Sequence, residues 1–170
     1  EQPRRQITLK QIERGRHTLK HAHPGTGLDG SIYAGLRKLV GELVQPWKQE
    51  DGGVMNVDRL MIDANWGTTQ PTVYKFCAES EHKSILTPAH GRYVGAKSTP
   101  WSEFKLKRGE RKGLNWRIPK SPDRHLLYDT NFWKNFIHSR FETAIGDPGS
   151  LTLFGLKEAA HEMFSLHCAA

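Results

Sequence analysis

The order of apolar and polar positions predicts helices that alternate with strands. Between residues 28 and 47 the apolar residues recur at helical spacing, and Pro46 helps to end that helix. Residues 57–63 form a short, largely apolar run that ends at Asp63, which predicts a central strand of a sheet. A helix with Pro71 in its first turn and one apolar face is expected to follow.

The second half of the chain continues this alternation. Residues 84–87 predict another strand, which Pro88 is expected to end. The other predicted elements are a half-exposed strand at 114–118, a strand at 125–128, a helix at 131–142, a strand at 151–154 and an amphipathic helix at 156–168. Strands and helices mixed in this way indicate the α/β class.

Composition narrows the class of protein further. The chain has 170 residues and a mass of 19.3 kDa, enough for one domain with its own core, and its 5 Trp, 7 Phe and 4 Tyr argue against wholesale disorder. No run reaches the roughly 18 apolar residues of a membrane span, which excludes a transmembrane protein. Two cysteines are too few for a disulfide framework or a four-cysteine zinc site. The first residues lack an initiator Met and a signal-peptide core, so we expect an excised piece of a longer chain.

Positive charge is concentrated in one stretch. Residues 88–124 hold ten Lys and Arg against three acids, an excess equal to the net charge of +7 for the whole chain. Tyr93, Trp101, Phe104 and Trp116 are interleaved with these bases. Such a stretch can bind the phosphates and bases of nucleic acid, or it can be a solvated basic loop anchored by its aromatic residues.

Asp63 is the most suggestive single residue for chemistry. It ends a hydrophobic strand, and ligands of open α/β sheets bind at the carboxyl ends of strands, where a carboxylate can hold Mg²⁺ or Mn²⁺. The alternative is that Asp63 accepts a hydrogen bond from the backbone of its own turn. For Asp129 we favour an N-terminal cap of the next helix. Lys134 can reach a phosphate, pair with a carboxylate or lie on the solvated face of that helix.

Other motifs are weaker or missing. His21 and His23 invite a metal interpretation, but no third ligand follows at a recognisable spacing. The sequence has no Ser-His-Asp or Cys-His pattern, and no nucleophile elbow or Walker A loop. An NTPase motor is therefore not expected in this segment.

Several segments together resemble a known family. The run Met-Ile-Asp-Ala-Asn-Trp-Gly at 61–67, followed by Val-Tyr-Lys-Phe-Cys at 73–77, is similar to the large terminase subunit of lambda-like tailed phages, the GpA family. The likeness continues through 88–95, 113–119, 128–134 and 151–155, in the same order and at similar spacing, and covers roughly residues 1–155.

This resemblance implies the C-terminal nuclease region, with an RNase H-like α/β fold, a central mixed sheet and a basic loop or hairpin insertion. It implies cleavage of double-stranded DNA during genome packaging, with three acids holding two Mg²⁺ or Mn²⁺ ions. Only one of the three acidic positions, the second, has a match here, at Asp63, which would be catalytic and metal-binding. We therefore expect a partial nuclease domain at 1–155, truncated at both ends and inactive or weakly active alone, followed by a tail helix at 156–170.

The resemblance also implies partners and a place of action. These are double-stranded DNA, the small terminase subunit and the portal in the full-length protein, no membrane, and the cytoplasm of the bacterial host. The residues expected to contact DNA are Arg92, Lys97, Lys105, Lys107, Arg108, Arg111, Lys112, Arg117 and Lys134. The alternatives are a non-catalytic nucleic-acid-binding module, an inactive prophage-derived fragment, or a structural fragment with a solvated basic loop.

Overall fold

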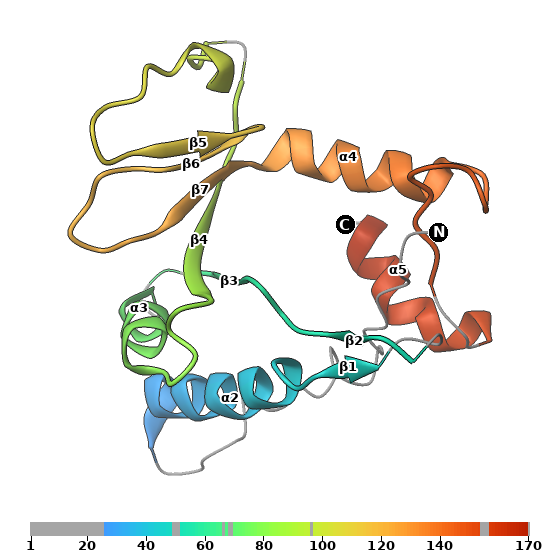
Figure 1. Cartoon of the computed structure of the whole chain (residues 1–170), viewed down its shortest axis with the longest axis horizontal. Helices are drawn as coiled ribbons and strands as arrows, with labels where there is room; N and C mark the ends of the chain where they lie inside the picture. The colour runs from blue at the N-terminus through green and yellow to red at the C-terminus, as the bar shows by residue number, and fades with distance from the viewer. Residues whose placement is uncertain are drawn as a thin grey trace. The chain divides into compact units, whose positions relative to one another are not determined.

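The computed structural model describes residues 26–48, 52–65, 67, 70–95, 97–153 and 157–169. The chain divides into two compact units, and each is considered by itself. The first contains residues 1–60, 78–85 and 153–170, and the second contains residues 61–77 and 86–152. Figure 1 labels the helices and strands in both.

The predicted first helix is confirmed as α2 (Gly27–Leu43) in the first unit. One face is buried through Ile32, Leu36 and Val40, which recur every four residues as helical periodicity requires. The helix ends where the Val44 N–H donates to the Val40 carbonyl at 2.9 Å, shortly before Pro46.

A two-stranded β-ladder follows α2, and the sequence pattern did not predict it. Strands β1 (Trp47–Lys48) and β2 (Val54–Met55) pair antiparallel, with Trp47 opposite Met55. The Trp47 indole N–H donates to the Leu43 carbonyl at 2.9 Å and so holds β1 against the end of α2. Strands of two residues are too short for an alternating pattern to reveal.

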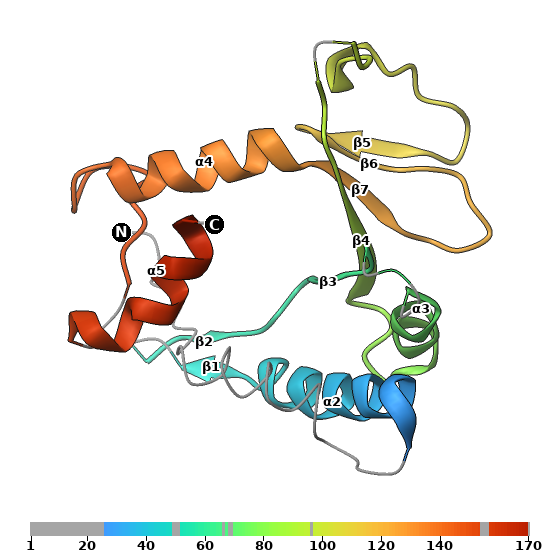
Figure 2. The same ribbon diagram turned by 180° about the vertical axis from the view of Figure 1, so that it is seen from behind.

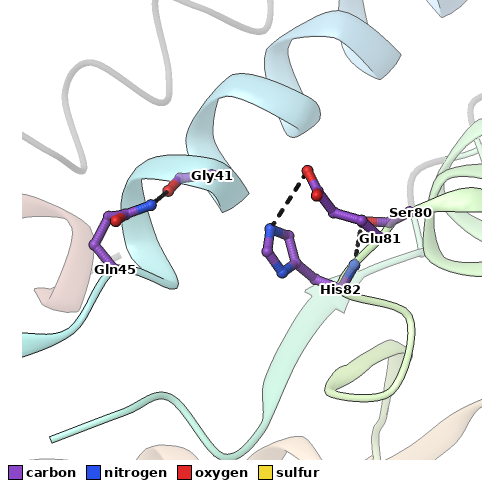
Figure 3. Close-up of polar contacts among 5 residues, drawn as sticks. All are labelled: Gly41, Gln45, Ser80, Glu81 and His82. Atoms are coloured by element: carbon purple, nitrogen blue, oxygen red, sulfur yellow. Dashed lines mark hydrogen bonds and ion pairs between the residues drawn. The ribbon is translucent and has the colours of Figure 1, made fainter.

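Some polar side chains of the first unit contact their neighbours in the sequence (Figure 3). The Gln45 amide donates to the Gly41 carbonyl one helical turn back, at 2.9 Å. In the turn at residues 80–83, the His82 N–H donates to the Ser80 hydroxyl at 3.1 Å, and the His82 ring lies 3.8 Å from the Glu81 carboxylate. Such neighbouring contacts shape turns and carry little stability.

Helix α3 (Gln70–Glu79) carries the apolar face that the sequence predicted. Val73, Phe76 and Cys77 are buried along it. Burial in apolar surroundings raises the pKa of the Cys77 thiol to about 11, so this cysteine packs as a small apolar side chain and is unreactive.

The second unit is built on a mixed sheet in the order β3-β4-β7-β6-β5 (Figure 2). Its strands are β3 (Leu60–Asp63), β4 (Leu86–Arg92), β5 (Arg111–Gly113), β6 (Trp116–Ile118) and β7 (Leu126–Asp129). β4 and β7 are parallel, whereas β5, β6 and β7 form antiparallel pairs. The α/β class is confirmed, and the mixed sheet agrees with an RNase H-like nuclease domain.

Two expectations about the first strands are wrong. β3 is not central: it ends the order of the described strands, and its Met61 is more than half exposed. Nor does Pro88 end the second strand, because β4 runs on to Arg92. Pairing of β4 with β7 begins at Ala89, so the missing N–H of Pro88 falls before that ladder.

The basic stretch folds into a hairpin that joins the sheet. β5 and β6 are linked by Leu114 and Asn115, and Asn115 adopts a left-handed φ of 52°, which asparagine tolerates better than most residues. The Asn115 carbonyl accepts the Asp129 N–H at 3.0 Å and the Trp133 indole N–H at 3.3 Å. The hairpin turn is thereby tied to β7 and the following helix.

That helix is α4 (Thr130–Glu142), and Asp129 is its N-terminal cap as predicted. The predicted strand at 151–154 is wrong for 151–153, which have no regular structure, and residue 154 lies outside the described residues. The Leu151 N–H instead donates to the Arg140 carbonyl at 2.9 Å.

The C-terminal residues of the first unit are helical. A 3₁₀ turn, η3 (Glu158–His161), leads into α5 (Glu162–Ala169), close to the predicted helix at 156–168. None of the helices in the described ranges combines the length and the apolar character that crossing a membrane requires.

Candidate functional site at the carboxyl edge of β3 and β4

Three strand ends share one edge of the sheet. The Leu60 N–H bonds to the Ile85 carbonyl and the Ala64 N–H bonds to the Ala89 carbonyl, both at 2.9 Å. Partners that advance together along both strands mean that β3 runs parallel to β4. Because β7 is also parallel to β4, the carboxyl ends of all three lie at the same edge, where ligands of such sheets bind.

Asp63 lies at this edge, at the last position of β3, and is exposed. Its Oδ1 atom accepts the backbone N–H of Asn65 at 3.1 Å. The two readings of Asp63 that the sequence left open are therefore compatible. The carboxylate ends a strand, and one of its oxygens is held by the turn that follows.

The side chain of Asn65 is anchored to β4 at both of its polar atoms. Its Nδ2 donates to the Gly91 carbonyl at 3.0 Å, and its Oδ1 lies 2.8 Å from Nδ1 of His90. Since the amide nitrogen faces a carbonyl, the amide oxygen must face the histidine. Nδ1 of His90 therefore carries the hydrogen.

His90 is buried, and its second ring nitrogen is also bonded. Nε2 lies 2.7 Å from the Tyr74 hydroxyl, which must donate because Nδ1 already holds the proton of the neutral ring. Burial lowers the pKa of His90, and the nearby His125 and Arg92 lower it further, against an opposing effect of Asp63. His90 is accordingly neutral at pH 7.

His125 completes the polar group around His90. Its ring packs edge-on to the rings of His90 and Tyr74, with centroids 5.4 Å and 6.2 Å away. Nδ1 of His125 lies 2.8 Å from the Asp123 carbonyl, which fixes its hydrogen there. Burial raises the pKa of Tyr74, so its hydroxyl remains a donor.

Glycine is required at position 91 by close packing. A Cβ atom there would lie 2.5 Å from Cγ2 of Thr130 and 3.2 Å from the hydroxyl oxygen of Tyr128. Burial raises the pKa of Tyr128, and the charge of Asp63 raises it further. The Thr130 hydroxyl donates to the Arg92 carbonyl at 3.1 Å and thus links α4 to β4 at the edge.

Asp129 lies at the same edge, and its carboxylate accepts hydrogen bonds from the start of α4. It lies opposite Arg92 in the pairing of β7 with β4, and its Oδ1 accepts the N–H groups of Asn131 and Phe132 at 3.0 Å and 3.1 Å. The favoured cap role is confirmed. This buried carboxylate satisfies the first turn of α4.

Most of the predicted DNA-contacting residues are exposed. Those with exposed side chains are Arg92, Lys97, Lys105, Lys107, Arg108, Arg111, Lys112 and Lys134. The structure does not bring them into one cluster with Asp63: Arg92 lies at the same sheet edge, most of the others lie along the segment from Lys97 to Lys112, and Lys134 lies on α4.

Two residues of the basic stretch hold its backbone together. Arg117 is half-buried, with its guanidinium carbon 4.2 Å from the ring centre of Phe104 and 5.9 Å from that of Trp101. The Lys112 ammonium donates to the carbonyls of Phe104, at 3.0 Å, and Ser102, at 3.3 Å. These contacts fasten η2 (Trp101–Glu103) and Phe104 to the β5–β6 hairpin.

Between η2 and the hairpin, residues 107–110 form a closed turn. The Glu110 N–H donates to the Lys107 carbonyl, and the Lys107 N–H donates to Oε2 of Glu110, both at 3.0 Å. Gly109 has a φ of 91°, which suits glycine at this position of a tight turn. The hydrogen bond from Lys107 lowers the pKa of Glu110, so its carboxylate is ionised at neutral pH.

Comparison with known proteins assigns the family. The sequence profile of the terminase large subunit gpA, endonuclease domain, matches residues 32–165, which include the sheet edge and the whole basic stretch. The chain belongs to this family. Searches of curated proteins and of solved structures found no match. The resemblance inferred from Asp63 and the segments around it is confirmed.

Terminase nucleases of this family imply a divalent metal, and the described residues fit that requirement only in part. Among them, no group of three His, Cys, Asp or Glu side chains is close enough to hold an ion. Asp63 offers one exposed carboxylate, which suits a hydrated Mg²⁺ that also binds DNA phosphates. The three-acid, two-ion centre is not assembled by the part of the chain that the structure describes.

In this terminase nuclease domain, the residues bonded in series to Asp63 were not among the predicted site residues. Asn65, Tyr74, His90 and His125 come from four separate segments, and no spacing rule joins them. One signal was present: Asn65 and His90 lie within the segments that resemble the family. His21 and His23 lie outside the described residues.

Proposed function

We propose that the chain binds duplex DNA as part of a terminase nuclease domain, and that Asp63 supplies one carboxylate for metal-dependent cleavage of the DNA backbone. The observation that carries this proposal is the position of Asp63 at the carboxyl end of β3, in the same compact unit as the basic stretch. Family membership supports DNA as the substrate.

Exposed charge supports the binding half of the proposal. Lysine and arginine side chains attract phosphates and release counterions, which gives affinity without base specificity. The residues proposed to make these contacts are Arg92, Lys97, Lys105, Lys107, Arg108, Arg111 and Lys134. Lys112 and Arg117 are proposed to act mainly through the shape of the segment, because their side chains are engaged within it.

The cleavage half assigns roles to residues of the sheet edge. Asp63 would hold the ion, with one oxygen oriented by Asn65, and Arg92 at the end of β4 would bind a neighbouring phosphate. A bound Mg²⁺ or Mn²⁺ supplies charge neutralisation at the phosphate and an acidified water. With one matched carboxylate, we expect the chain alone to cleave DNA poorly.

DNA binding is tested by titrating a fluorescent 30-base-pair duplex at several salt concentrations. We expect similar dissociation constants for unrelated sequences and a steep, linear loss of affinity with the logarithm of salt concentration. Affinity that does not change with salt would contradict the proposal.

Cleavage is tested with supercoiled plasmid and Mn²⁺, comparing the unaltered chain with Asp63→Asn. We expect little or no nicking by either. Robust cleavage that Asp63→Asn abolishes would confirm the role of Asp63 and show that other acids complete the centre. The second candidate, a non-catalytic nucleic-acid-binding module, is favoured by the lack of a metal cluster among the described residues. It predicts Mn²⁺ affinity that Asp63→Asn leaves unchanged.

In the full-length protein, the proposal extends to the small terminase subunit and the portal as partners, and to the cytoplasm of the bacterial host as the place of action. Family membership supports these only in general terms. The division into a nuclease part at 1–155 and a tail helix at 156–170 is likewise a proposal.

A further inference from the structure

The proposed function gives no role to the buried side chain of His90. His90 is only 6% exposed, although a buried imidazole is stable only when both of its ring nitrogens are bonded. Its two partners come from different segments: Asn65 from the turn after β3 and Tyr74 from α3. A side chain that served only to fill the core would be apolar at such a position.

The bonds of His90 form part of a chain that ends at Asp63. The Tyr74 hydroxyl donates to Nε2 of His90, Nδ1 donates to the Asn65 amide oxygen, and the Asn65 backbone N–H donates to Oδ1 of Asp63. The Asn65 amide nitrogen is bonded at the same time to the Gly91 carbonyl. Asn65 is thus held at two points by β4, and its backbone in turn holds the carboxylate.

We propose that His90 is a positioning residue: as the neutral Nδ1–H tautomer it fixes Asn65, and Asn65 fixes the side-chain rotamer of Asp63. What Asp63 then does rests on the proposed function, whereas the positioning can be measured without any metal or DNA. His90 itself does not contact the reacting groups, because both of its nitrogens are already bonded.

The chain of bonds distinguishes two conservative replacements of His90. The amide nitrogen of asparagine can stand where Nδ1 stands, so His90→Asn keeps the bond to Asn65 and loses the one to Tyr74. Glutamine reaches the position of Nε2, so His90→Gln keeps the bond to Tyr74 and loses the one to Asn65. If His90 only filled space, the two variants would have the same effect on Asp63.

The test is solution NMR of the full chain at pH 7. Histidine ¹⁵N shifts should report the Nδ1–H tautomer for His90. Three-bond couplings of Asp63 should report one χ1 rotamer in the unaltered chain and in His90→Asn, and rotamer averaging in His90→Gln and Asn65→Ala. Tyr33→Phe, which removes a hydroxyl bonded to Glu79 outside this chain of bonds, should leave the couplings unchanged.

Each other outcome overturns the proposal. An Nε2–H or doubly protonated His90 contradicts the tautomer, and a single Asp63 rotamer in Asn65→Ala contradicts the positioning. If His90→Gln unfolds the chain, Asn65→Ala and the tautomer decide the matter. Mn²⁺ titration tests the proposed function separately: loss of a residue that orients a metal ligand typically weakens metal binding by about 10- to 100-fold. No Asp63-dependent binding would refute the metal role and leave the rotamer result intact.

Discussion

The edge of β3 and β4 and the basic stretch differ in what their polar side chains bond to. At the edge, the side chains of Asn65 and Tyr74 bond to the buried ring of His90, and that of Asn65 also bonds to the backbone of β4. In the basic stretch most charges face solvent, whereas Arg117, Lys112 and Glu110 bond to or pack against other parts of the segment. Side chains in one network affect one another, whereas separated exposed charges act almost additively.

The largest expected effect comes from removing exposed charge. Replacing Lys105, Lys107, Arg108 and Arg111 by Gln should lower the slope of log affinity against log salt by about 0.9 for each lost phosphate contact. When salt is raised from 50 to 200 mM, four phosphate contacts account for a roughly hundredfold loss of DNA affinity, and the variant should not show this part of the loss.

The matched control removes the same charge elsewhere, through Gln at the exposed residues Arg37, Lys38, Lys48 and Lys83. Fluorescence anisotropy at several salt concentrations measures both variants. Equal losses in the two would show that net charge, and not the basic stretch, determines binding.

At the sheet edge, the largest loss of stability is expected from a single methyl group. Gly91→Ala would place a Cβ against Thr130 and Tyr128, and overpacking of this kind costs about 1–3 kcal/mol. Gly41→Ala, within α2 and with nothing near the added Cβ, should instead stabilise the helix by roughly 0.5–1 kcal/mol. Urea denaturation measures both, and a neutral Gly91→Ala would contradict the close packing.

A comparison of Arg117 with Arg108 distinguishes residues that stabilise the basic stretch from residues that contact phosphate. Arg117→Gln removes the contact with Phe104 and should cost about 1 kcal/mol of folding stability, with little change in the salt slope of DNA binding. Arg108→Gln should change stability by less than about 0.5 kcal/mol and lower the slope. The opposite pattern would make Arg117 the phosphate contact.

Acid should weaken the sheet edge through His90. Burial, His125 and Arg92 lower its pKa in the folded chain, against Asp63, while Tyr74 bonds its second nitrogen. Below about pH 6.5 the unfolded chain therefore binds more protons than the folded chain does. The free energy of unfolding decreases as the pH is lowered through this range. His90→Asn should reduce that dependence; an identical pH profile would contradict the buried neutral ring.

The smallest effect distinguishes two acids of the basic stretch. Glu103→Gln and Glu110→Gln each remove one negative charge, which by charge alone should tighten DNA binding by about twofold. Glu110→Gln should tighten it less or weaken it, because a neutral amide oxygen accepts the Lys107 N–H more weakly than the carboxylate does. Anisotropy at 100 mM salt compares them, and equal tightening would show that this turn needs no cap.

Local features were predicted well from the sequence. Asp63 at a strand end, Asp129 as a cap and a strand near 114–118 follow from periodicity and from residues adjacent in the chain, whereas the hairpin was implied only by the family resemblance. The continuation of β4 beyond Pro88 was not predictable in this way, since it depends on where β7 begins to pair.

The polar group around His90 could not be predicted for a related reason. Asn65 and Tyr74 lie 25 and 16 residues away in sequence, and only the register of β3 against β4 and the position of α3 bring them to the ring. Arg117 is similar, because it was expected to contact DNA, whereas its guanidinium packs on the ring of Phe104.

The carbonyl of Asn115 gives the hairpin a mechanical property. It accepts hydrogen bonds from the Asp129 backbone and the Trp133 indole, so the tip of the hairpin is attached at two points to β7 and the first turn of α4. A force applied to the hairpin would therefore pass directly into the sheet. The hairpin would then move together with β7 and the start of α4, because its turn cannot shift without breaking these two hydrogen bonds.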